Sequence, residues 1–389
     1  AKLNDIIIQI GDKYYDTVSV PVEDNTSDKF TYHFTIPQEI DESDTPIIIT
    51  AVPFDDGFDY EIVNRVSLND NQSSNQVSSR QVVYGTKLTL GLVEGKLREH
   101  GLEGKVNLNV TAPRKTVKMG CMAVEFIRVN HSIPDAVGMA VHTPAGVIVH
   151  TGDFKIDFSP INSGIIDLTR FGELGSKGVL ALMADSTNAE RPGYTQSERK
   201  VGESFEKLFK KADGKRIIIA TFSSNIHRIQ QILNCAERYG RKVAVFGRSM
   251  INVITTAIEL GYLSVPNGVL IDIDMMNRYD SSEIVLITTG SQGEPMSALT
   301  RMAMNDHKKV NITPMDFIII SATPIPGNEK YVTKVVNELM KSGAEVVYEA
   351  MYEVHVSGHA CQEELKLIQA LTKPKFFIPV HGEYKHLKK

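Results

Sequence analysis

Asn130-His131-Ser132-Ile133-Pro134-Asp135 and His150-Thr151-Gly152-Asp153 are two of four short segments that set histidine or aspartate beside glycine, serine or proline. The other two, His355-Val356-Ser357-Gly358-His359 and Pro379-Val380-His381-Gly382-Glu383, lie toward the end of the chain. Most of them follow an apolar run that is typical of a β-strand. Loops at strand ends carry the chemistry of many enzymes, and neutral imidazole with carboxylate is a common ligand set for zinc or manganese. A lone histidine is more often structural, but four such segments together indicate a functional site.

From about residue 195 the chain alternates helical and strand patterns, which is typical of a parallel sheet with helices on both faces. Thr195-x-x-Glu198 predicts a capping box at the start of a helix that runs to Ala212. Strands are predicted at 122–129, 136–142, 147–150, 179–183, 216–222, 242–246 and 375–380. Beyond about residue 82 the pattern is therefore that of an α/β protein.

The first 80 residues have a different pattern. Short apolar or alternating runs, separated by Asp, Gly, Pro and Ser, predict strands at 5–10, 14–22, 30–36, 46–53 and 60–68. Strands of this length and spacing predict a small all-β module, with a sandwich as its expected form, over residues 1–68. The stretch 69–81, rich in Asn, Gln and Ser, is expected to be a polar linker.

Charge supports a boundary near residue 82. The chain carries a net charge of −5, but residues 1–82 hold 5 Lys and Arg against 15 Asp and Glu, a balance of −10. The remainder holds 37 against 32, a balance of +5, and a mildly basic body suits partners rich in phosphate. The acidic first part would repel such partners.

Four further segments extend the pattern from residue 82 to the end of the chain. They are Val83-Tyr84-Gly85-Thr86-Lys87-Leu88, Ala184-Asp185-Ser186-Thr187-Asn188, Thr289-Gly290-Ser291-Gln292-Gly293-Glu294-Pro295-Met296 and Pro324-Ile325-Pro326-Gly327-Asn328. With the first four segments they resemble the ribonuclease J family, the β-CASP branch of the metallo-β-lactamase fold. The resemblance implies a lactamase-fold domain over 82–196 and 351–389, its N-terminal half incomplete, with a β-CASP α/β domain inserted at 197–350.

The resemblance also implies roles for individual residues. It assigns His131 to one of two divalent metals, His381 to the other, and Asp153 to a bridging position between them. The resemblance implies zinc as the metal, with manganese or magnesium as alternatives. It makes Asp185 and His359 catalytic, with His359 as a general acid or a stabiliser of transition-state charge. The alternative for Asp185 is a cap for the segment that follows it.

Two groups of residues are implied to contact RNA. The loop formed by His355, Ser357, Gly358 and His359 would bind the phosphate beside the scissile bond, because glycine permits close approach and the other side chains can donate hydrogen bonds. Two loops before helices would hold a 5′-monophosphate and its nucleotide, where free backbone N–H groups favour anions. These loops are Ser223-Ser224-Asn225 and Gly247-Arg248-Ser249, and ordinary helix capping is their alternative role.

One metal motif of the family, His-x-His-x-Asp-His, is missing before the Tyr84-Gly85-Thr86-Lys87 segment. Each metal would then have about two protein ligands, where a stable site needs three or four. The acidic run 55–61 lies near the expected place but is more typical of a solvated loop. Either residues 1–80 are foreign to the nuclease, with the chain ends at Ala1 and Lys389 cut or spliced, or this member gave up the motif.

The expected activity is metal-dependent hydrolysis of single-stranded RNA in RNA maturation and decay. The enzyme would remove nucleotides in the 5′→3′ direction from monophosphorylated 5′ ends and would also cleave internal bonds. The rivals are a non-catalytic RNA-binding scaffold and a spliced fragment. The family resemblance implies RNA, a homo-oligomer (dimer or tetramer) and RNA-decay or ribosome-associated proteins as partners. No run approaches the roughly 20 apolar residues of a membrane span. The three cysteines are odd in number and widely spaced and form no CxxC pair, so we expect the protein to be located in the reducing cytoplasm. They are Cys121, Cys235 and Cys361.

Overall fold

The computed structural model describes residues 3–10, 13–19, 47–53, 62–66 and 81–389, except Pro295, Pro326 and Ala350. The chain divides into two compact units, residues 1–83 with 102–107 and residues 84–101 with 108–389, and each is considered by itself. The predicted strand at 30–36, the acidic run 55–61 and residues 69–80 of the predicted linker lie outside the described residues.

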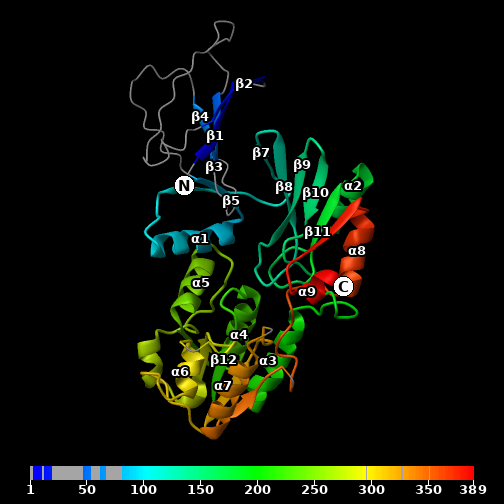
Figure 1. Ribbon diagram of the computed structural model, residues 1–389. Helices are drawn as coiled ribbons and strands as arrows, with labels where there is room; N and C mark the ends of the chain where they lie inside the picture. Colours follow the sequence, from blue (N-terminus) through cyan, green and yellow to red (C-terminus); the bar gives the residue numbers. More distant parts are fainter. Residues whose placement is uncertain are drawn as a thin grey trace. The chain divides into compact units, whose positions relative to one another are not determined.

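The described part of the first unit is all β, as predicted. Its strands are β1 (Leu3–Ile10), β2 (Lys13–Ser19), β3 (Ile47–Pro53) and β4 (Ile62–Val66). They form one antiparallel sheet in the order β2-β1-β3-β4 (Figure 1). The second sheet of a sandwich is not among the residues that the structure describes here. β5 (Gln81–Gly85) and β6 (Val106–Val110) pair with each other where the division between the units falls.

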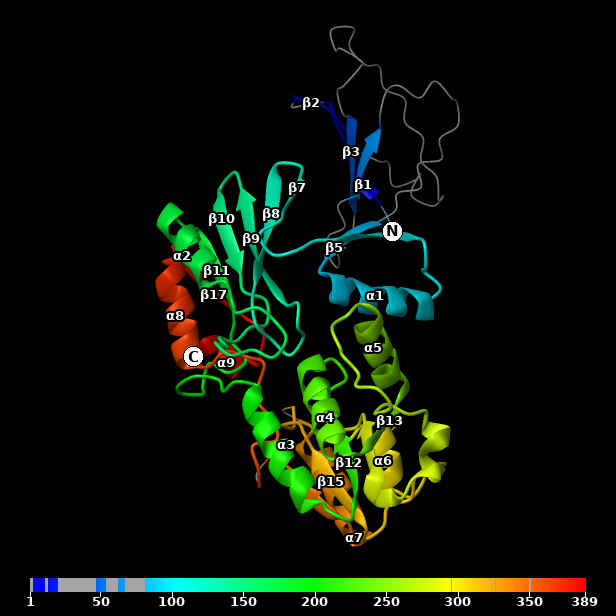
Figure 2. The ribbon, with the colours of Figure 1, turned by 180° about the vertical axis from the view of Figure 1, so that it is seen from behind.

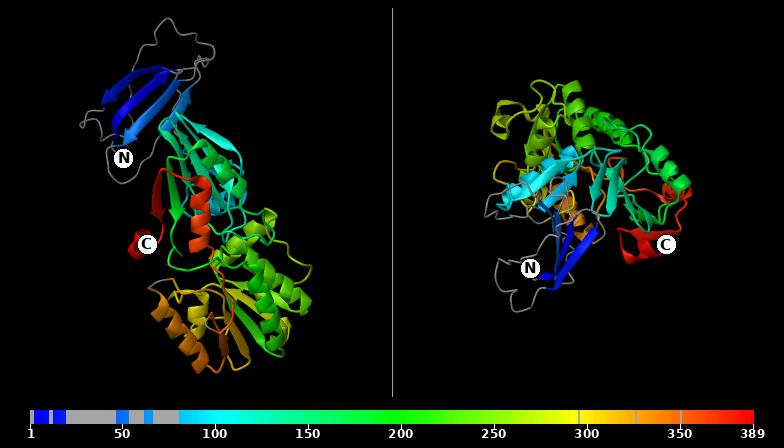
Figure 3. Two further views of the ribbon diagram at one scale, coloured as in Figure 1. Left: turned by 90° about the vertical axis from the view of Figure 1, so that its right-hand side faces the viewer. Right: turned by 90° about the horizontal axis from the view of Figure 1, so that it is seen from above.

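The second unit contains two sheets, and the first has six strands in the order β17-β11-β10-β9-β8-β7. Their bounds are β7 Thr116–Met119, β8 Met122–Arg128, β9 Val137–Thr143, β10 Gly146–His150, β11 Ala181–Asp185 and β17 Phe376–Val380. β7 to β10 form an antiparallel meander, in which β9 and β10 correspond to the strands predicted at 136–142 and 147–150. β10, β11 and β17 run parallel to one another. Figure 3 shows β17 beside β11, nearly 200 residues away along the chain.

Two helices pack on this sheet, α2 (Leu168–Lys177) and α8 (Gln362–Thr372), and they lie side by side (Figures 1 and 2). Phe171 and Leu174 of α2 and Ile368 of α8 are buried in one cluster with the sheet residues Val149 and Leu182. This packing holds the ends of β10, β11 and β17 in place. Two helices outside this layer are α1 (Lys87–Glu99) and α9 (Tyr384–Lys388).

The second sheet has five parallel strands in the order β13-β14-β12-β15-β16. The strands are β12 Arg216–Ala220, β13 Lys242–Phe246, β14 Ile284–Thr288, β15 Asp316–Ile320 and β16 Glu345–Val347. The helices around it are α3 Arg199–Lys211, α4 Ile226–Arg238, α5 Arg248–Glu259, α6 Ala298–Ala303 and α7 Glu329–Lys341, with short 3₁₀ turns at Ile273–Arg278 and Ser281–Glu283. The predicted parallel α/β architecture is confirmed.

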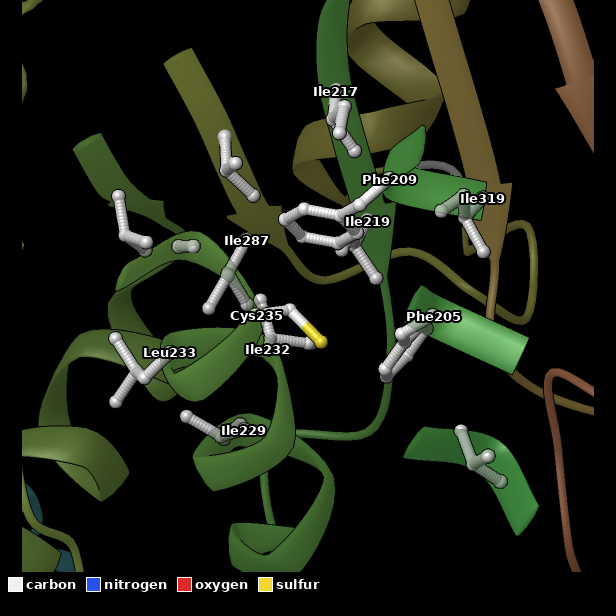
Figure 4. Close-up of a cluster of buried hydrophobic side chains, with 14 of the residues drawn as sticks. Phe205, Phe209, Ile217, Ile219, Ile229, Ile232, Leu233, Cys235, Ile287 and Ile319 are labelled. Atoms are coloured by element: carbon white, nitrogen blue, oxygen red, sulfur yellow. The ribbon is translucent and has the colours of Figure 1, made fainter. Parts of the chain in front are cut away.

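Both faces of this sheet are apolar, because successive side chains of a strand point to opposite faces. Ile217 and Ile219 of β12 belong to one cluster with residues of α3, α4 and α5. Figure 4 shows part of this cluster, with Phe205 and Phe209 of α3 near β12. Ile218 belongs to the other cluster, with α6 and α7. All three isoleucines are fully buried, which explains the uninterrupted apolar sequence of the strand.

The predicted capping box is wrong. Glu198 is the N-cap residue of α3 and makes no side-chain capping bond, and Thr195 Oγ1 donates to the carbonyl oxygen of His359 at 2.7 Å instead. The Glu198 carboxylate pairs with the guanidinium of Arg228. Both side chains have partners far along the chain, so the local pattern was misleading. No helix in the described part of the chain is long and apolar enough to cross a membrane.

Candidate metal centre

The four histidine- and aspartate-bearing segments meet at one edge of the six-stranded sheet. Asp153 follows β10, Asp185 ends β11 and His381 follows β17. Because these three strands are parallel neighbours, their carboxyl ends lie together. His131 follows β8 and is held there by the bridge between Asn130 and Lys155. Sequence reasoning singled out each of these positions, and the fold brings them together.

Three imidazoles and one carboxylate form the centre of this site. Asp153 Oδ2 lies 4.0 Å from His131 Nε2 and 3.7 Å from His381 Nε2. The ring centroid of His359 lies 5.0 Å from that of His131 and 5.3 Å from that of His381. Ligand atoms of His131, Asp153 and His359 lie within 4.8 Å of one another, so His359 also qualifies as a ligand by distance.

Hydrogen bonds orient two of the imidazoles. His131 Nδ1 donates to the carbonyl oxygen of Gly358 at 2.9 Å, and His359 Nδ1 donates to Asp185 Oδ2 at 2.7 Å. A metal-binding histidine characteristically uses one ring nitrogen in this way, which leaves the other as the ligand. Nε2 of His131 is therefore available to an ion.

The geometry fits divalent ions. Metal–nitrogen and metal–oxygen bonds are about 2.0–2.2 Å long, so two ligand atoms separated by 3.7 or 4.0 Å can share one ion. Asp153 would be common to His131 and His381. Each ion would then have two ligands from the described residues, fewer than a tightly held zinc site has.

Electrostatics divide the histidines into two kinds. Burial lowers the pKa of His131, so its imidazole is neutral, as a ligand must be. Burial would also lower the pKa of His359, but the hydrogen bond and charge of Asp185 outweigh this effect and raise it. Burial works to raise the pKa of Asp185, yet its bond to His359 brings it below the ordinary value. Asp185 and His359 therefore form a hydrogen-bonded pair that favours a proton on the imidazole.

Asp185 also has the capping role that was its alternative. Its Oδ1 accepts from the backbone N–H of Thr187 at 3.0 Å and from the Thr187 hydroxyl at 2.7 Å. Because Oδ2 bonds His359, the two oxygens serve different purposes. The carboxylate is 1% exposed and fixed on both sides.

The loop before α8 packs directly on His131, one of the predicted metal ligands. Ser357 Oγ accepts from Asn188 Nδ2 at 2.9 Å and from the backbone N–H of His359 at 3.1 Å. A Cβ on Gly358 would lie 2.5 Å from His131 Nδ1, so only glycine fits. The predicted phosphate-binding residues therefore lie beside the predicted metal ligands.

The two predicted 5′-nucleotide loops follow β12 and β13 at the carboxyl edge of the parallel sheet, where α/β folds commonly bind ligands. Ser223 Oγ and Ser249 Oγ are 3.2 Å apart. Gly247 is the N-cap residue of α5 and has a φ of 99°, and a Cβ there would lie 2.8 Å from Thr289 Oγ1. Asn225 has the alternative role, since its side chain caps α4 by accepting from the N–H of Arg228.

Sequence reasoning missed a buried group of charges behind the loop. Lys155, Asp157, Glu198 and Arg228 are each at most 6% exposed. Lys155 Nζ lies 3.6 Å from Asp157, and Glu198 pairs with Arg228 at 2.8 Å. The sequence of α4 contains several polar and charged residues, so the presence of Arg228 in it gave no signal that this side chain is buried.

A six-stranded sheet with histidines and aspartates gathered at its strand ends, interrupted by a parallel α/β domain, defines a metallo-β-lactamase-fold protein with a β-CASP insertion. Family models support this assignment. Residues 214–339 match "Ribonuclease J, beta-CASP domain" and residues 343–389 match "Zn-dependent metallo-hydrolase RNA specificity domain". From about residue 82 onward the chain belongs to the ribonuclease J family.

Individual ribonucleases J are similar to this chain over most of its length. The chain is 47% identical over 306 residues to Ribonuclease J of Thermus thermophilus, which covers 78% of this chain and 53% of that protein. It is 46% identical over 304 residues to Ribonuclease J2 of Bacillus subtilis, which covers 78% and 54%. The chain thus spans about half the length of the curated relatives it matches.

A solved structure supports the fold alone. The crystal structure of a protein of unknown function from Enterococcus faecalis V583 matches with a TM-score of 0.54 at 15% sequence identity. The match covers 88% of this chain and 91% of that one.

Proposed function

We propose that this chain is a metal-dependent ribonuclease of the ribonuclease J type, hydrolysing phosphodiester bonds of single-stranded RNA. The observation that carries the proposal is the hydrogen bond between Asp185 and His359, set beside the His131–Asp153–His381 cluster. A proton donor beside paired metal ligands is the arrangement that phosphodiester hydrolysis needs. The names of the relatives support RNA as the substrate.

His131, Asp153 and His381 would hold the divalent ions, zinc or else manganese or magnesium. Such ions supply an activated water and stabilise charge on the phosphate oxygens. The protein's own part is proton transfer and positioning. Asp185 accepts the Nδ1–H of His359 and so favours the doubly protonated imidazole, whose Nε2–H can pass to the leaving oxygen.

The loop 355–359 would bind the phosphate next to the bond that breaks. Ser357 and Gly358 lie against His131, so a phosphate held there is also close to the ions. Ser223, Ser224, Asn225, Gly247, Arg248 and Ser249 would surround the 5′-monophosphate. A site closed at a 5′ end favours stepwise 5′→3′ removal of nucleotides, with internal cleavage as a second mode.

The rival function is RNA binding without catalysis. It is favoured by the low number of ligands per ion that the described residues offer and by the absent His-x-His-x-Asp-His segment. Under this rival the phosphate loops persist, and RNA binding survives removal of metal.

The test uses a 5′-monophosphorylated, 3′-labelled single-stranded RNA with manganese or zinc, and with a chelator in parallel. The nuclease proposal expects mononucleotide products with metal, none with chelator, and at least about a hundredfold slower release by Asp185→Asn. Binding without products at any metal concentration would establish the rival instead.

Three further proposals accompany the nuclease assignment: a cytoplasmic location, a homo-oligomer and association with RNA-decay or ribosomal proteins. The absence of a CxxC pair supports the first. Light scattering on the purified chain tests the second, and a monomer at all concentrations would refute it. Co-sedimentation with ribosomes, compared with a ribosome-free control, tests the third.

A further inference from the structure

Arg228 is the largest fully buried side chain among the described residues, with 0% of its surface exposed. It lies in the first turn of α4, directly after the loop that ends β12 (Figure 1). Burying a guanidinium without partners is costly, so the hydrogen bonds it makes indicate its purpose.

The guanidinium joins three separate segments. Its Nε and Nη2 donate to the two carboxylate oxygens of Glu198 at 2.8 and 3.0 Å. Nη1 donates to the carbonyl oxygen of Ser321 at 2.8 Å. The remaining donors reach the loop before α8, at His355 Nδ1 (3.0 Å) and the Val356 carbonyl oxygen (3.4 Å). Five donors in a planar fork serve all these acceptors, which a lysine ammonium cannot do.

Arg228 also decides which nitrogen of His355 carries the proton. Burial, with the charge of Arg228 second, lowers the pKa of His355 to about 2, so its imidazole is neutral. A guanidinium can only donate, so Nδ1 of His355 accepts and the single ring proton is on Nε2. That Nε2 has no hydrogen-bond partner in the part of the chain that the structure describes. It is therefore an N–H donor ready for an oxygen ligand.

Ser321 strengthens the same arrangement from the other side. Its hydroxyl donates to the carbonyl oxygen of Val354 at 2.6 Å, while its own carbonyl accepts from Arg228. The start of the loop is therefore held from the carboxyl ends of β12 and β15.

We propose that Arg228 is a positioning residue, which fixes the loop 354–359 against the metal centre and holds His355 as the Nε2–H tautomer that donates to a phosphate oxygen of RNA. The part of this inference that names RNA rests on the proposed function. The tautomer and the loop contacts do not.

The first experiment needs no variant. Nitrogen NMR of the ¹⁵N-histidine-labelled chain reports which ring nitrogen carries the proton, and His355→Gln assigns the signal. For His355 we expect an unprotonated Nδ1 and a protonated Nε2 at about pH 6 to 8. A protonated Nδ1, or an exchanging mixture, overturns the proposal.

The second experiment compares Arg228→Lys with Arg241→Lys. Arg241 is the matched control, because it is 6% exposed and donates to backbone carbonyl oxygens of Ala212 and Lys215, away from the loop. In chelator, Arg228→Lys is expected to bind single-stranded RNA about tenfold more weakly and to lose the fixed tautomer. Arg241→Lys should change neither.

The outcomes separate the two proposals. Wild-type affinity and tautomer in Arg228→Lys, or equal losses in both variants, overturn the positioning role. If Arg228→Lys does not fold, the tautomer of His355 in the wild-type chain tests the proposal: a protonated Nδ1 overturns it and a protonated Nε2 supports it. If the wild-type chain binds no RNA, the proposed function and the phosphate contact both fail, while the tautomer still tests the role of Arg228.

Discussion

Replacing Gly358 by alanine should disturb the metal centre without replacing any of its proposed ligands. The new Cβ would lie 2.5 Å from His131 Nδ1 and 2.7 Å from Ser132 Oγ, whereas real Cβ contacts essentially never fall below 3.0 Å. The loop or His131 must therefore move by about 0.5 Å or more, the difference between 2.5 and 3.0 Å. This movement strains the 2.9 Å bond between His131 Nδ1 and the Gly358 carbonyl oxygen, which orients the imidazole.

The size of the effect follows from that bond. Losing the group that orients a metal ligand typically costs about 10–100-fold in metal affinity. Displacing reacting groups by about 1 Å costs about a hundredfold in rate. For Gly358→Ala we expect metal affinity to fall at least about tenfold, and RNA cleavage at saturating metal to slow by about one order of magnitude or more.

Competition with a chromogenic chelator measures the metal affinity, and a thermal melt measures stability. Gly95→Ala is the control, because Gly95 lies in α1 and no heavy atom comes within 4 Å of a Cβ placed there. That variant should gain about 0.5–1 kcal/mol of stability and keep its metal affinity. Wild-type metal affinity and cleavage in Gly358→Ala would refute the packing argument.

Three further predictions follow. His381→Ala should lower metal binding, whereas His359→Ala should slow cleavage with metal binding unchanged; a loss of metal in both would make His359 a ligand. The guanidinium of Arg191 is exposed, has no hydrogen-bond partner among the described residues and carries charge that reaches His359. Arg191→Ala should therefore reduce the slope of log affinity for RNA against log salt by about 0.7, and an unchanged slope would exclude a phosphate contact. Burial lowers the pKa of His227 from 6.5 to about 4, so as pH falls the unfolded chain binds this proton before the folded chain does. The free energy of unfolding that His227 contributes is therefore fully present above pH 6.5, and on the order of 3 kcal/mol of it is lost as pH falls to 4. Denaturant unfolding should show a weaker loss in His227→Gln, and an equal loss would contradict the assignment.

Local sequence patterns were sufficient to predict the position of most helices and strands in the α/β part of the chain. The helix predicted to run to Ala212 forms at Arg199–Lys211, and the strand predicted at 242–246 forms at Lys242–Phe246. The strand predicted at 375–380 forms at Phe376–Val380 and leads into His381. These elements could be predicted because their apolar periodicity and turn residues are adjacent in sequence.

Contacts between distant segments could not be predicted in the same way. Thr195 and Glu198 have the spacing of a capping box, but their partners are His359 and Arg228. The role of Arg228 depends on His355, 127 residues away, which no local pattern reveals. For the same reason the sequence could not show that His359 lies close enough to His131 and Asp153 to compete as a ligand.

Metal binding by the purified chain tests the account most directly. Equilibrium dialysis against zinc or manganese, followed by elemental analysis, gives the number of ions per chain for the wild type and for Asp153→Ala. Because Asp153 Oδ2 lies within 4.0 Å of both His131 and His381, we predict up to two ions in the wild type and loss of both in the variant. No bound metal in the wild type, or unchanged binding in Asp153→Ala, would contradict a shared metal centre at these strand ends.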